Sequence, residues 1–247
     1  MPERSQRVVL VRHTLEPEAL TALGARLCYA GGDVDRLLRT IEEKDQRAFV
    51  ERVMAMGHES VLEHVSFTFL IEGVSRVLLA QLTRHRIASF SVQSQRYVSY
   101  AGGFGYIVPP AIRALGPDAE AEYHAQMAQM QAWYEGWQKR LGDAGEKSNE
   151  DARFVLPGAC ETRVLLTMNA RELRHFFSLR MCSRAQWEIR ALAGTMFDLC
   201  CKEAPALFRD AGPGCLRGAC PEREKSCGKQ AQIRKARQEY LERQGMQ

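Results

Sequence analysis

The sequence lacks a long apolar run and any strong surplus of charge of one sign. A membrane-spanning helix needs roughly 18 consecutive apolar residues, and no stretch of these 247 residues approaches that length. Lys and Arg number 34 and Asp and Glu 30, so the net charge of +4 is too small to indicate a general nucleic-acid binder. Residues 1–6 are polar and do not resemble a secretory signal peptide. We therefore expect a cytoplasmic protein whose eight cysteines are reduced.

Several motifs of nucleotide-binding and hydrolytic enzymes are also missing. The chain contains neither the G-x-G-x-x-G turn nor the P-loop, so a bound nucleotide would depend on arginine side chains. The G-x-S-x-G motif of the α/β-hydrolases is absent. The serines near His85 have no Asp close in sequence to orient the histidine. A hydrolase is therefore not favoured.

The hydrophobic pattern predicts helices and strands without a regular alternation. Residues Val65, Phe67, Phe69 and Ile71 share one face, which is the period expected of a half-buried strand. Strands are predicted at residues 8–11, 65–71 and 164–168, and helices at 19–30, 33–56, 74–86, 118–141 and 169–204. The expected interruptions are Gly73, the loop 102–117 and the linker 142–149. This mixture predicts an α+β fold with a mixed or antiparallel sheet packed with long helices.

A run of cationic and hydrogen-bonding side chains begins at the end of the predicted helix 74–86. It begins with Arg84, His85 and Arg86 and continues through serines and glutamines to Arg96. Arginine carries a planar fork of donors that matches phosphate or carboxylate. A solvated helix end, where cations suit the helix dipole, would explain an isolated basic triplet. Because the polar series extends beyond the triplet into a stretch flanked by aromatic residues, we favour an anion site.

Two arginines interrupt the apolar stripe of the predicted helix 169–204. The stripe consists of Leu173, Phe177, Arg180, Arg184, Trp187 and Ala191, in steps of three and four residues. A buried guanidinium is costly without a partner. For Arg184, a structural ion pair with Glu188 or with a distant carboxylate, and a bound anion, are both open interpretations. Arg180 has no acid three or four residues away, so we favour a bound anion there.

His58, Glu59, Glu63 and His64 raise the question of a metal site. The zincin motif places two histidines four residues apart around a glutamate, whereas these histidines are six residues apart. That spacing separates them on a helix, so no metal is predicted here. A polar cofactor in front of these side chains and a capped helix before the strand remain open.

Three cysteines, Cys215, Cys220 and Cys227, lie in a C-terminal stretch rich in Gly and Pro. Three thiolates could bind a metal with a fourth ligand elsewhere in the chain. The spacing matches no standard zinc motif, so no metal is predicted at these residues either.

Taken together, the polar segments resemble the flavin-dependent thymidylate synthase family. Arg84-His85-Arg86, then seven residues and Ser94-Gln95-Arg96, resemble the R-H-R-x7-S-x-R signature of that family. Residues 57–64 resemble its upstream G-H-E-[ST]-x-x-E-H segment. Further likeness to its C-terminal half is found at residues 153–157, 169–171 and 179–188. The similarity covers roughly residues 8–208.

The resemblance implies an enzyme with a cofactor. The family converts dUMP to dTMP, taking a methylene group from 5,10-methylenetetrahydrofolate and a hydride from FAD that NADPH has reduced. The flavin supplies the reducing equivalents, and the protein orients and polarises the substrate. Members are homotetramers whose sites combine more than one subunit. The resemblance therefore implies a single oligomerising catalytic domain at residues 1–208, followed by a Cys-containing basic tail at 209–247.

Carried over by position, the family's ligand contacts fall on the polar segments. The resemblance implies dUMP contacts at Gln81, Arg84, Ser94, Gln95, Arg96, Arg153 and Arg180. It implies FAD contacts at Ser60, Glu63, Arg84, His85, Arg86, Ile87, Asn169, Arg171 and His175. Arg180 would be the catalytic residue against the pyrimidine, because a cation favours the enolate-like form of uracil. His58 would lie near the flavin and the folate.

Three positions depart from patterns common in the family. Val92 stands where a glutamate is often found, so a polar ligand contact is missing or comes from the main chain. His175 stands where some members have Asn, and Cys28 where others have a serine near the flavin. None of these departures removes a group that the reaction needs.

A different class of function is a non-catalytic nucleotide- or RNA-binding protein that uses the same arginine-rich segments. Such a protein is expected to interleave exposed aromatic residues on a basic face. The arginines here are predicted to interrupt apolar faces instead, so we expect an enzyme.

Overall fold

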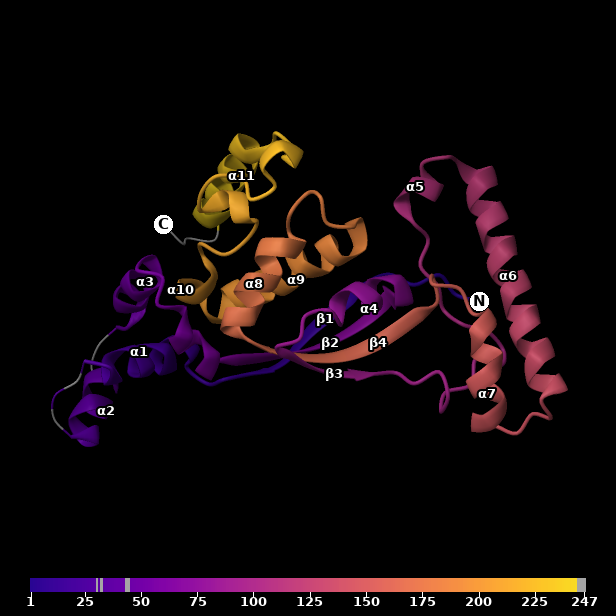
Figure 1. Cartoon of the computed structure of the whole chain (residues 1–247), viewed down its shortest axis with the longest axis horizontal. Coiled ribbons are helices and arrows are strands. Elements are labelled where there is room, and N and C mark those ends of the chain that lie inside the picture. Colours follow the sequence, from indigo (N-terminus) through magenta and orange to yellow (C-terminus); the bar gives the residue numbers. More distant parts are fainter. Residues whose placement is uncertain (30, 32, 43–44, 244–247) are drawn as a thin grey trace. The chain divides into compact units, whose positions relative to one another are not determined.

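Figure 1 shows the computed structural model, which describes residues 1–247 apart from 30, 32, 43–44 and 244–247. The chain divides into two compact units. Unit 1 contains Met1–Val9, Leu70–Arg84 and Phe90–Leu166, and unit 2 contains Leu10–Phe69, His85–Ser89 and Thr167–Gln247. The predicted boundary between residues 208 and 209 falls inside unit 2 and stays a prediction.

Four strands form an antiparallel sheet in the order β1-β2-β4-β3. The strands are β1 Arg7–His13, β2 Ser66–Ser75, β3 Ala88–Val92 and β4 Glu161–Asn169, and each contributes residues to both units. Thr68 of β2 lies opposite Thr167 of β4, with their hydroxyl oxygens 2.9 Å apart. In β2, the alternating residues Phe67, Phe69 and Ile71 are fully buried, as their period predicts. The α+β class is confirmed.

Strand β2 continues past Gly73, which the sequence pattern predicts to end it. Gly73 has φ +67°, a conformation that glycine adopts without steric cost. Its N–H donates to Oε1 of Glu161 over 3.1 Å. A Cβ atom at this position would lie 1.9 Å from the carbonyl oxygen of Ser5. The glycine therefore permits a close approach of the N-terminal backbone and does not terminate the strand.

Unit 1 contains the long helix α6, Pro117–Arg140, which confirms the helix predicted at 118–141. Its buried Met127 packs in a cluster with Phe104, Tyr106 and Cys160. The remaining helices of the unit are α4 Arg76–Leu82, α5 Pro110–Arg113, α7 Glu146–Ala152 and the 3-10 turn η2 Arg153–Val155. Helix α5 lies in the segment predicted as a loop, and α7 occupies part of the predicted linker.

Unit 2 holds most of the helices. They are α1 Pro17–Leu27, α2 Val34–Glu42, α3 Arg47–Ala55, η1 Glu59–His64, α8 Ala170–Arg180, α9 Trp187–Glu203, α10 Pro205–Phe208, η3 Gly214–Leu216, η4 Arg223–Lys225 and α11 Gln230–Arg243. Phe208 packs edge-on against Phe67 and Phe177, with ring centroids 5.4 and 5.9 Å away. These rings join α8 and α10 to β2 in one core. No helix among the described residues is long and apolar enough to cross a membrane.

The helix predicted at 33–56 is two helices, α2 and α3. The buried side chain of Gln46 lies just before α3, and its Nε2 donates to the carbonyls of Thr40 and Ile41 over 3.2 and 3.1 Å. These carbonyls belong to the last turn of α2, where the helix provides no internal partner. The apolar spacing does not reveal this break, because it depends on one polar side chain.

The helix predicted at 169–204 is also two helices, α8 and α9. Oε1 of Gln186 accepts hydrogen bonds from the N–H groups of Glu188 and Ile189 over 3.0 and 3.1 Å, and this side-chain cap starts a new helix. Arg184 lies in the connection, so the predicted stripe does not continue through it. The prediction that Arg184 interrupts an apolar helix face is wrong.

Gly73→Ala should lower the free energy of unfolding by roughly 2–4 kcal/mol, because the added methyl group meets the Ser5 carbonyl and the positive φ is strained for alanine. Urea denaturation of the purified variants measures this change. Gly136→Ala is the matched control, since a Cβ there meets nothing within 4 Å and alanine is the better helix former by up to about 1 kcal/mol. Equal stability of the two variants would contradict the close approach.

Candidate functional site

The predicted ligand contacts fall into two groups, one in each unit. Unit 1 carries the predicted dUMP contacts Gln81, Arg84, Ser94, Gln95, Arg96 and Arg153. Unit 2 carries Arg180, His58 and the predicted FAD contacts other than Arg84.

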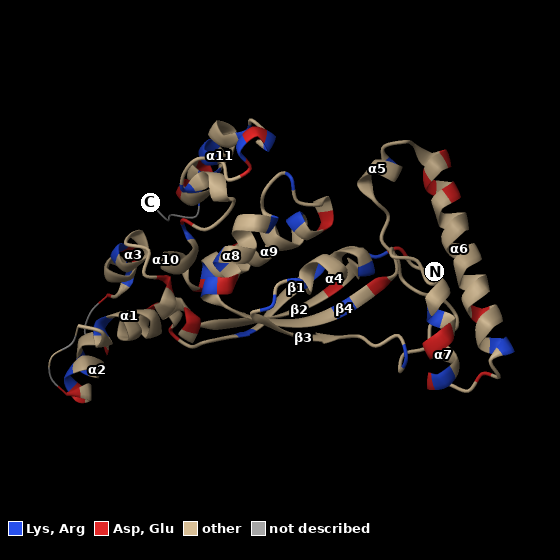
Figure 2. Cartoon of the chain, viewed as in Figure 1, with Lys and Arg blue, Asp and Glu red and all other residues tan. Residues whose placement is uncertain are grey.

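In unit 1, Arg96 lies beside the acidic residues of α7. Its guanidinium is 2.7 Å from Oε1 of Glu146 and 2.9 Å from Oε2 of Glu150. The Nε of Arg153 donates to the carbonyl of Glu150 over 3.0 Å, so these two predicted dUMP contacts both lie at this helix. Figure 2 shows acidic and basic residues interspersed along α7. All three ion-paired side chains are more than two-fifths exposed, so water weakens their attraction.

The other predicted residues of unit 1 differ in exposure. The Oγ of Ser94 accepts hydrogen bonds from the N–H groups of Arg96 and Tyr97, which fixes the turn that carries Arg96. Gln95 is buried and donates to the Sγ of Cys160 over 3.7 Å. Arg84 is exposed, and Gln81 is half-buried. The structure thus brings Ser94, Arg96 and Arg153 to the region of α7 and directs Gln95 into the core.

In unit 2, His85 is hydrogen-bonded through both ring nitrogens. Its Nδ1 lies 3.0 Å from Oε1 of Glu172, and its Nε2 accepts from the Nε of Arg180 over 3.1 Å. Because a guanidinium only donates, Nε2 carries no proton and Nδ1–H donates to Glu172. Burial lowers the pKa of His85, the hydrogen bond to Glu172 raises it, and the charge of Arg180 lowers it. The imidazole is therefore neutral and connects a buried carboxylate to Arg180.

Helix α8 places these groups by a local capping interaction. Asn169 precedes the helix, and its Oδ1 accepts from the N–H of Glu172 over 2.8 Å. This confirms the predicted helix start. The carboxylate of Glu172 does not complete a reciprocal capping box, because it is bonded to His85.

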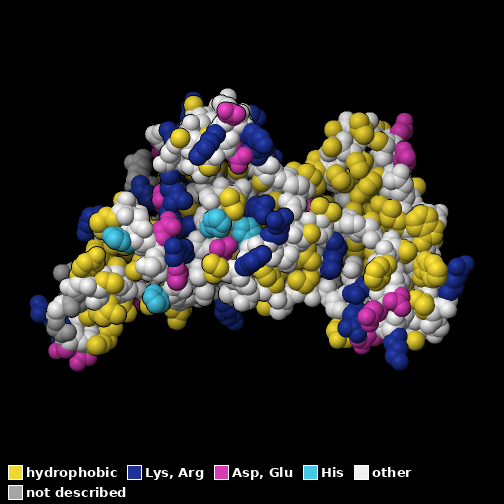
Figure 3. Space-filling model, in the orientation of Figure 1, with side chains coloured by type: hydrophobic (Ala, Val, Ile, Leu, Met, Phe, Trp, Pro, Cys, Tyr) yellow, Lys and Arg dark blue, Asp and Glu magenta, His cyan; other side chains and the backbone are white. Residues whose placement is uncertain are grey.

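A pocket of about 540 Å³ lies beside α8 in unit 2. Five of the predicted FAD contacts line it, namely Glu63, Ile87, Asn169, Arg171 and His175, together with Glu59, Glu172, Arg174, Ser178 and Arg217. Figure 3 shows histidine, basic and acidic side chains gathered over α8. The lining does not include His58, Ser60, His85 or Arg86.

The arginines of this pocket form ion pairs with carboxylates of the protein. Arg171 is paired with Glu63, and Arg217 lies 3.2 Å from Glu59. The arginine side chains are about half exposed, so each pair is worth about 0–1 kcal/mol. A charge-assisted hydrogen bond to a bound anion is worth about 1.5–3 kcal/mol. An anionic ligand can therefore replace these partners.

Arg174 is the buried arginine that sequence reasoning missed. Its side chain is 1% exposed. Its guanidinium makes a bidentate contact with Asp210, at 2.6 and 2.9 Å, and donates to the carbonyl of Leu207 over 2.6 Å. Glu59 lies 3.3 Å away. Asp210 is 36 residues further along the chain, so no local spacing signals this pair.

Of the two kinds of partner considered for Arg184, the structure has the distant carboxylate and not Glu188. Its Nε lies 3.2 Å from Glu222, and its Nη1 donates to the carbonyl of Lys225 over 2.8 Å. The interpretation of a structural ion pair holds, but the acid is Glu222 and the side chain is half exposed.

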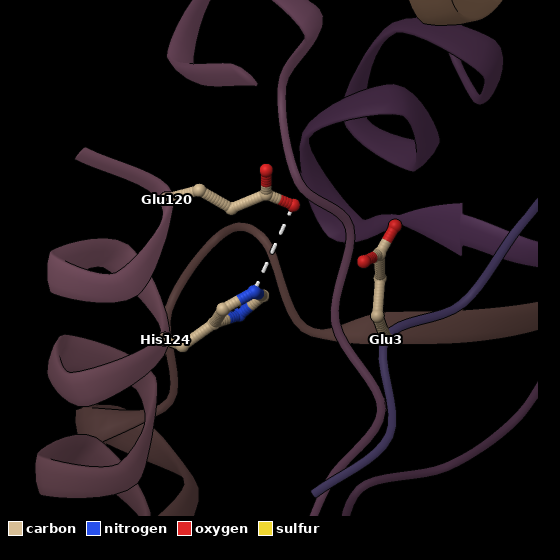
Figure 4. A group of neighbouring side chains, drawn as sticks. All are labelled: Glu3, Glu120 and His124. Carbon is tan, nitrogen blue, oxygen red and sulfur yellow. Dashed lines mark ion pairs between the residues drawn. The ribbon is translucent and has the colours of Figure 1, made fainter. Parts of the chain in front are cut away.

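Among the described residues, one group of three or more ligand atoms lies within 4.8 Å, formed by Glu3, Glu120 and His124 of unit 1. Figure 4 shows the Glu120 carboxylate pointing toward the His124 ring. Arg113 already donates to both carboxylates, and the hydroxyl of Tyr106 lies 2.6 Å from Nδ1 of His124. The guanidinium supplies the positive charge that the carboxylates need, so this group has no need of a metal.

Comparison with known proteins identifies the family. Residues 9–206 match the sequence model of the family described as thymidylate synthase complementing protein. The chain is 51% identical over 230 residues to a flavin-dependent thymidylate synthase of Geobacter sulfurreducens, covering 93% of this chain and 97% of that protein. It belongs to the flavin-dependent thymidylate synthase family.

Two further proteins extend the comparison. A flavin-dependent thymidylate synthase of Clostridium tetani is 45% identical over 239 residues, covering 93% of this chain and 96% of that protein. The crystal structure of the UMP/dUMP methylase PolB from Streptomyces cacaoi, bound with 5-Br dUMP, aligns with a TM-score of 0.68 and 27% identity. That alignment covers 83% of this chain and 94% of PolB. The residues matched by the family model, 9–206, include all the predicted dUMP and FAD contacts of this flavin-dependent thymidylate synthase family member.

The buried neutral His85 should make the protein less stable in acid. The unfolded chain takes up a proton as the pH falls through the ordinary histidine pKa of about 6.5, whereas folded His85, with its lowered pKa, takes it up at lower pH. The free energy of unfolding should therefore fall below that pH, by at most about 1.4 kcal/mol per pH unit from one proton.

Urea denaturation of wild type and His85→Gln at pH 7.5 and 5.5 measures this contribution, and the variant should lose less stability between the two values. His64→Gln, at an exposed histidine of the same unit, is the matched control and should keep the wild-type dependence. An unchanged dependence in His85→Gln would rule out the neutral, buried imidazole.

Proposed function

We propose that this chain is a flavin-dependent thymidylate synthase that converts dUMP to dTMP. Its methylene donor is 5,10-methylenetetrahydrofolate, and FAD reduced by NADPH provides the hydride. The observation that carries this proposal is the 51% identity to a protein of that name over 93% of the chain. The likeness to a dUMP methylase structure bound with 5-Br dUMP supports the choice of substrate.

For dUMP, we assign Gln81, Arg84, Ser94, Gln95, Arg96, Arg153 and Arg180. The planar guanidinium groups suit the phosphate, because each offers two parallel donors. Arg96 exchanges its exposed partners Glu146 and Glu150 for the phosphate. Arg180 acts on the base, where its charge favours the enolate-like form of uracil and makes C5 more nucleophilic.

His85 and Glu172 position Arg180. The imidazole accepts from the Nε of Arg180 and donates to Glu172, so the direction of the guanidinium is fixed before substrate arrives. Preorganised donors of this kind cost little reorganisation when charge develops on the substrate. Glu172 and His85 therefore serve the reaction by holding Arg180, and Arg180 contacts the substrate.

The residues of the α8 pocket fit FAD by their chemistry. Arg171 and Arg217 carry the positive charge that a pyrophosphate needs, and Asn169 and His175 offer hydrogen bonds to the polar edges of the ring system. Ile87 adds an apolar contact. When bound, FAD supplies the hydride that reduces the methylene group to a methyl group. The exposed residues Ser60, Arg86 and His58 would complete the contacts to FAD and folate in a homotetramer whose subunits share each site.

Tritium release provides the direct test of the proposed reaction. Purified protein should be yellow and should release tritium from C5-labelled dUMP only when both methylenetetrahydrofolate and NADPH are present, because forming the C5–methyl bond displaces the C5 hydrogen. A colourless protein that takes up no FAD and binds oligonucleotides with a steep salt dependence would favour a non-catalytic nucleic-acid binder.

Arg180→Ala should raise the Kd for dUMP about 10- to 100-fold, as expected for the loss of a charge-assisted contact, and should also lower kcat. The variant should stay folded and yellow. Calorimetric titration of dUMP and the tritium assay measure the two effects. Arg52→Ala, at an exposed arginine of α3, is the control. Wild-type kinetics in Arg180→Ala would assign Arg180 a purely structural role.

A further inference from the structure

Four cysteines from two distant parts of the sequence line one small pocket in unit 2. Cys182 follows the end of α8, Cys215 lies in η3, and Cys220 and Cys227 flank η4. All four line a pocket of about 110 Å³, and all are free thiols. The sequence indicated three of these cysteines and no fourth ligand. The fold supplies Cys182 as the fourth.

Arg184 connects the loop that carries Cys182 to the segment that carries Cys220 and Cys227. Arg184, in the loop of Cys182, pairs with Glu222 at 3.2 Å and donates to the carbonyl of Lys225 over 2.8 Å. Both partners lie between Cys220 and Cys227. These contacts join the backbone segments that carry Cys182, Cys220 and Cys227. The closeness of the thiols therefore does not depend on side-chain packing alone.

Helix α11 fixes the Cys215 loop from another direction. Gln230 and Arg234 each donate to the carbonyls of Cys215 and Gly218, over distances of 2.6 to 3.1 Å. These hydrogen bonds hold the backbone of Cys215 and Gly218 beside the pocket.

The segment around these cysteines has little apolar core of its own. Residues 209–229 contain only the short turns η3 and η4, and α11 has no buried residue. Natural mini-proteins with a small core add disulfides or a metal, and the cysteines of this segment form no disulfide. The ion pair of Arg184 with Glu222 also lines the pocket.

We propose that Cys182, Cys215, Cys220 and Cys227 bind one soft metal centre through four thiolates. Both Zn²⁺ and an iron–sulfur cluster take four cysteine ligands. On binding Zn²⁺, each thiol gives up its proton to solvent and forms a Zn–S bond, with no change of oxidation state. Formation of the site therefore weakens as the pH falls.

The spacing of the sulfur atoms distinguishes the two centres. No three of the four lie within 4.8 Å of one another, whereas tetrahedral zinc with bonds of about 2.3 Å holds its sulfurs about 3.8 Å apart. Binding of Zn²⁺ therefore requires the thiols to move closer together, whereas the larger iron–sulfur cluster holds its four thiolates further apart.

The metal centre would also order the neighbouring ligand site. Cys182 lies two residues after Arg180, and Ser178 lines both this pocket and the larger α8 pocket. Arg217, between Cys215 and Cys220, pairs with Glu59 in the larger pocket. A metal bound by the four cysteines thus fixes the end of α8 and the position of Arg217.

Metal analysis of the full-length protein tests the proposal independently of thymidylate synthesis. Protein purified anaerobically in a thiol reductant without chelators should contain either about one zinc per chain, released by a mercurial thiol reagent, or iron with a matching amount of acid-labile sulfide. Metal-free protein that binds neither Zn²⁺ nor Co²⁺ on addition would overturn the proposal, as would disulfide bonds among these cysteines in that sample.

Variants then locate the metal. Cys220→Ser and Cys227→Ser should reduce the metal content at least about tenfold, since each removes one of four ligands, and should lower the Tm. Cys28→Ser, at an exposed cysteine of the same unit, is the matched control for metal content and Tm. In wild type loaded with Co²⁺, thiolate coordination should be visible at wavelengths beyond the flavin absorption. Full metal content in both cluster variants would show that the metal binds elsewhere.

Discussion

The hydrogen-bonded chain from Glu172 through His85 to Arg180 is the interaction on which the proposed chemistry depends. Its geometry requires a neutral imidazole whose Nδ1 proton points at the carboxylate. Burial opposes the charged form of His85, and the hydrogen bonds to Glu172 and Arg180 select the tautomer. A fixed Arg180 can then meet the substrate without first being ordered, which is the advantage of a preorganised site.

Exposure separates two kinds of ion-paired arginine in this protein. Arg174 is enclosed and bonded to Asp210, so removing either partner would leave a buried charge. Three other arginines are partly exposed and form ion pairs with glutamates, namely Arg96, Arg171 and Arg217. A phosphate can replace these glutamates at little cost in free energy. The presence of acidic partners therefore does not argue against ligand binding at these three positions.

Local patterns predicted the local features. The alternation in β2, the length of α6 and the start of the helix at residue 169 all depend on residues within a few positions of one another, and all are confirmed. The helix breaks near Gln46 and Gln186 were missed because a single polar side chain overrides a continuous apolar period. Gly73 was misinterpreted because its role depends on Ser5, far away in the sequence.

The features that could not be predicted depend on contacts between segments that are distant in the sequence. Nothing near Arg174 indicates Asp210, and nothing near Cys215 indicates Cys182 as a neighbour. The family signature implies roles for His85, Asn169 and Arg171, but its spacing does not reveal that His85 is bonded to Glu172, nor that Arg96 is paired with α7. Only the fold supplies these partners.

A double-mutant cycle on dUMP affinity tests the central claim most directly. Titration calorimetry would compare Glu172→Gln in the wild-type background and in the Arg180→Ala background. If the chain acts through Arg180, Glu172→Gln weakens dUMP binding in wild type and has little further effect once Arg180 is gone. An equal loss of affinity in both backgrounds would contradict the account.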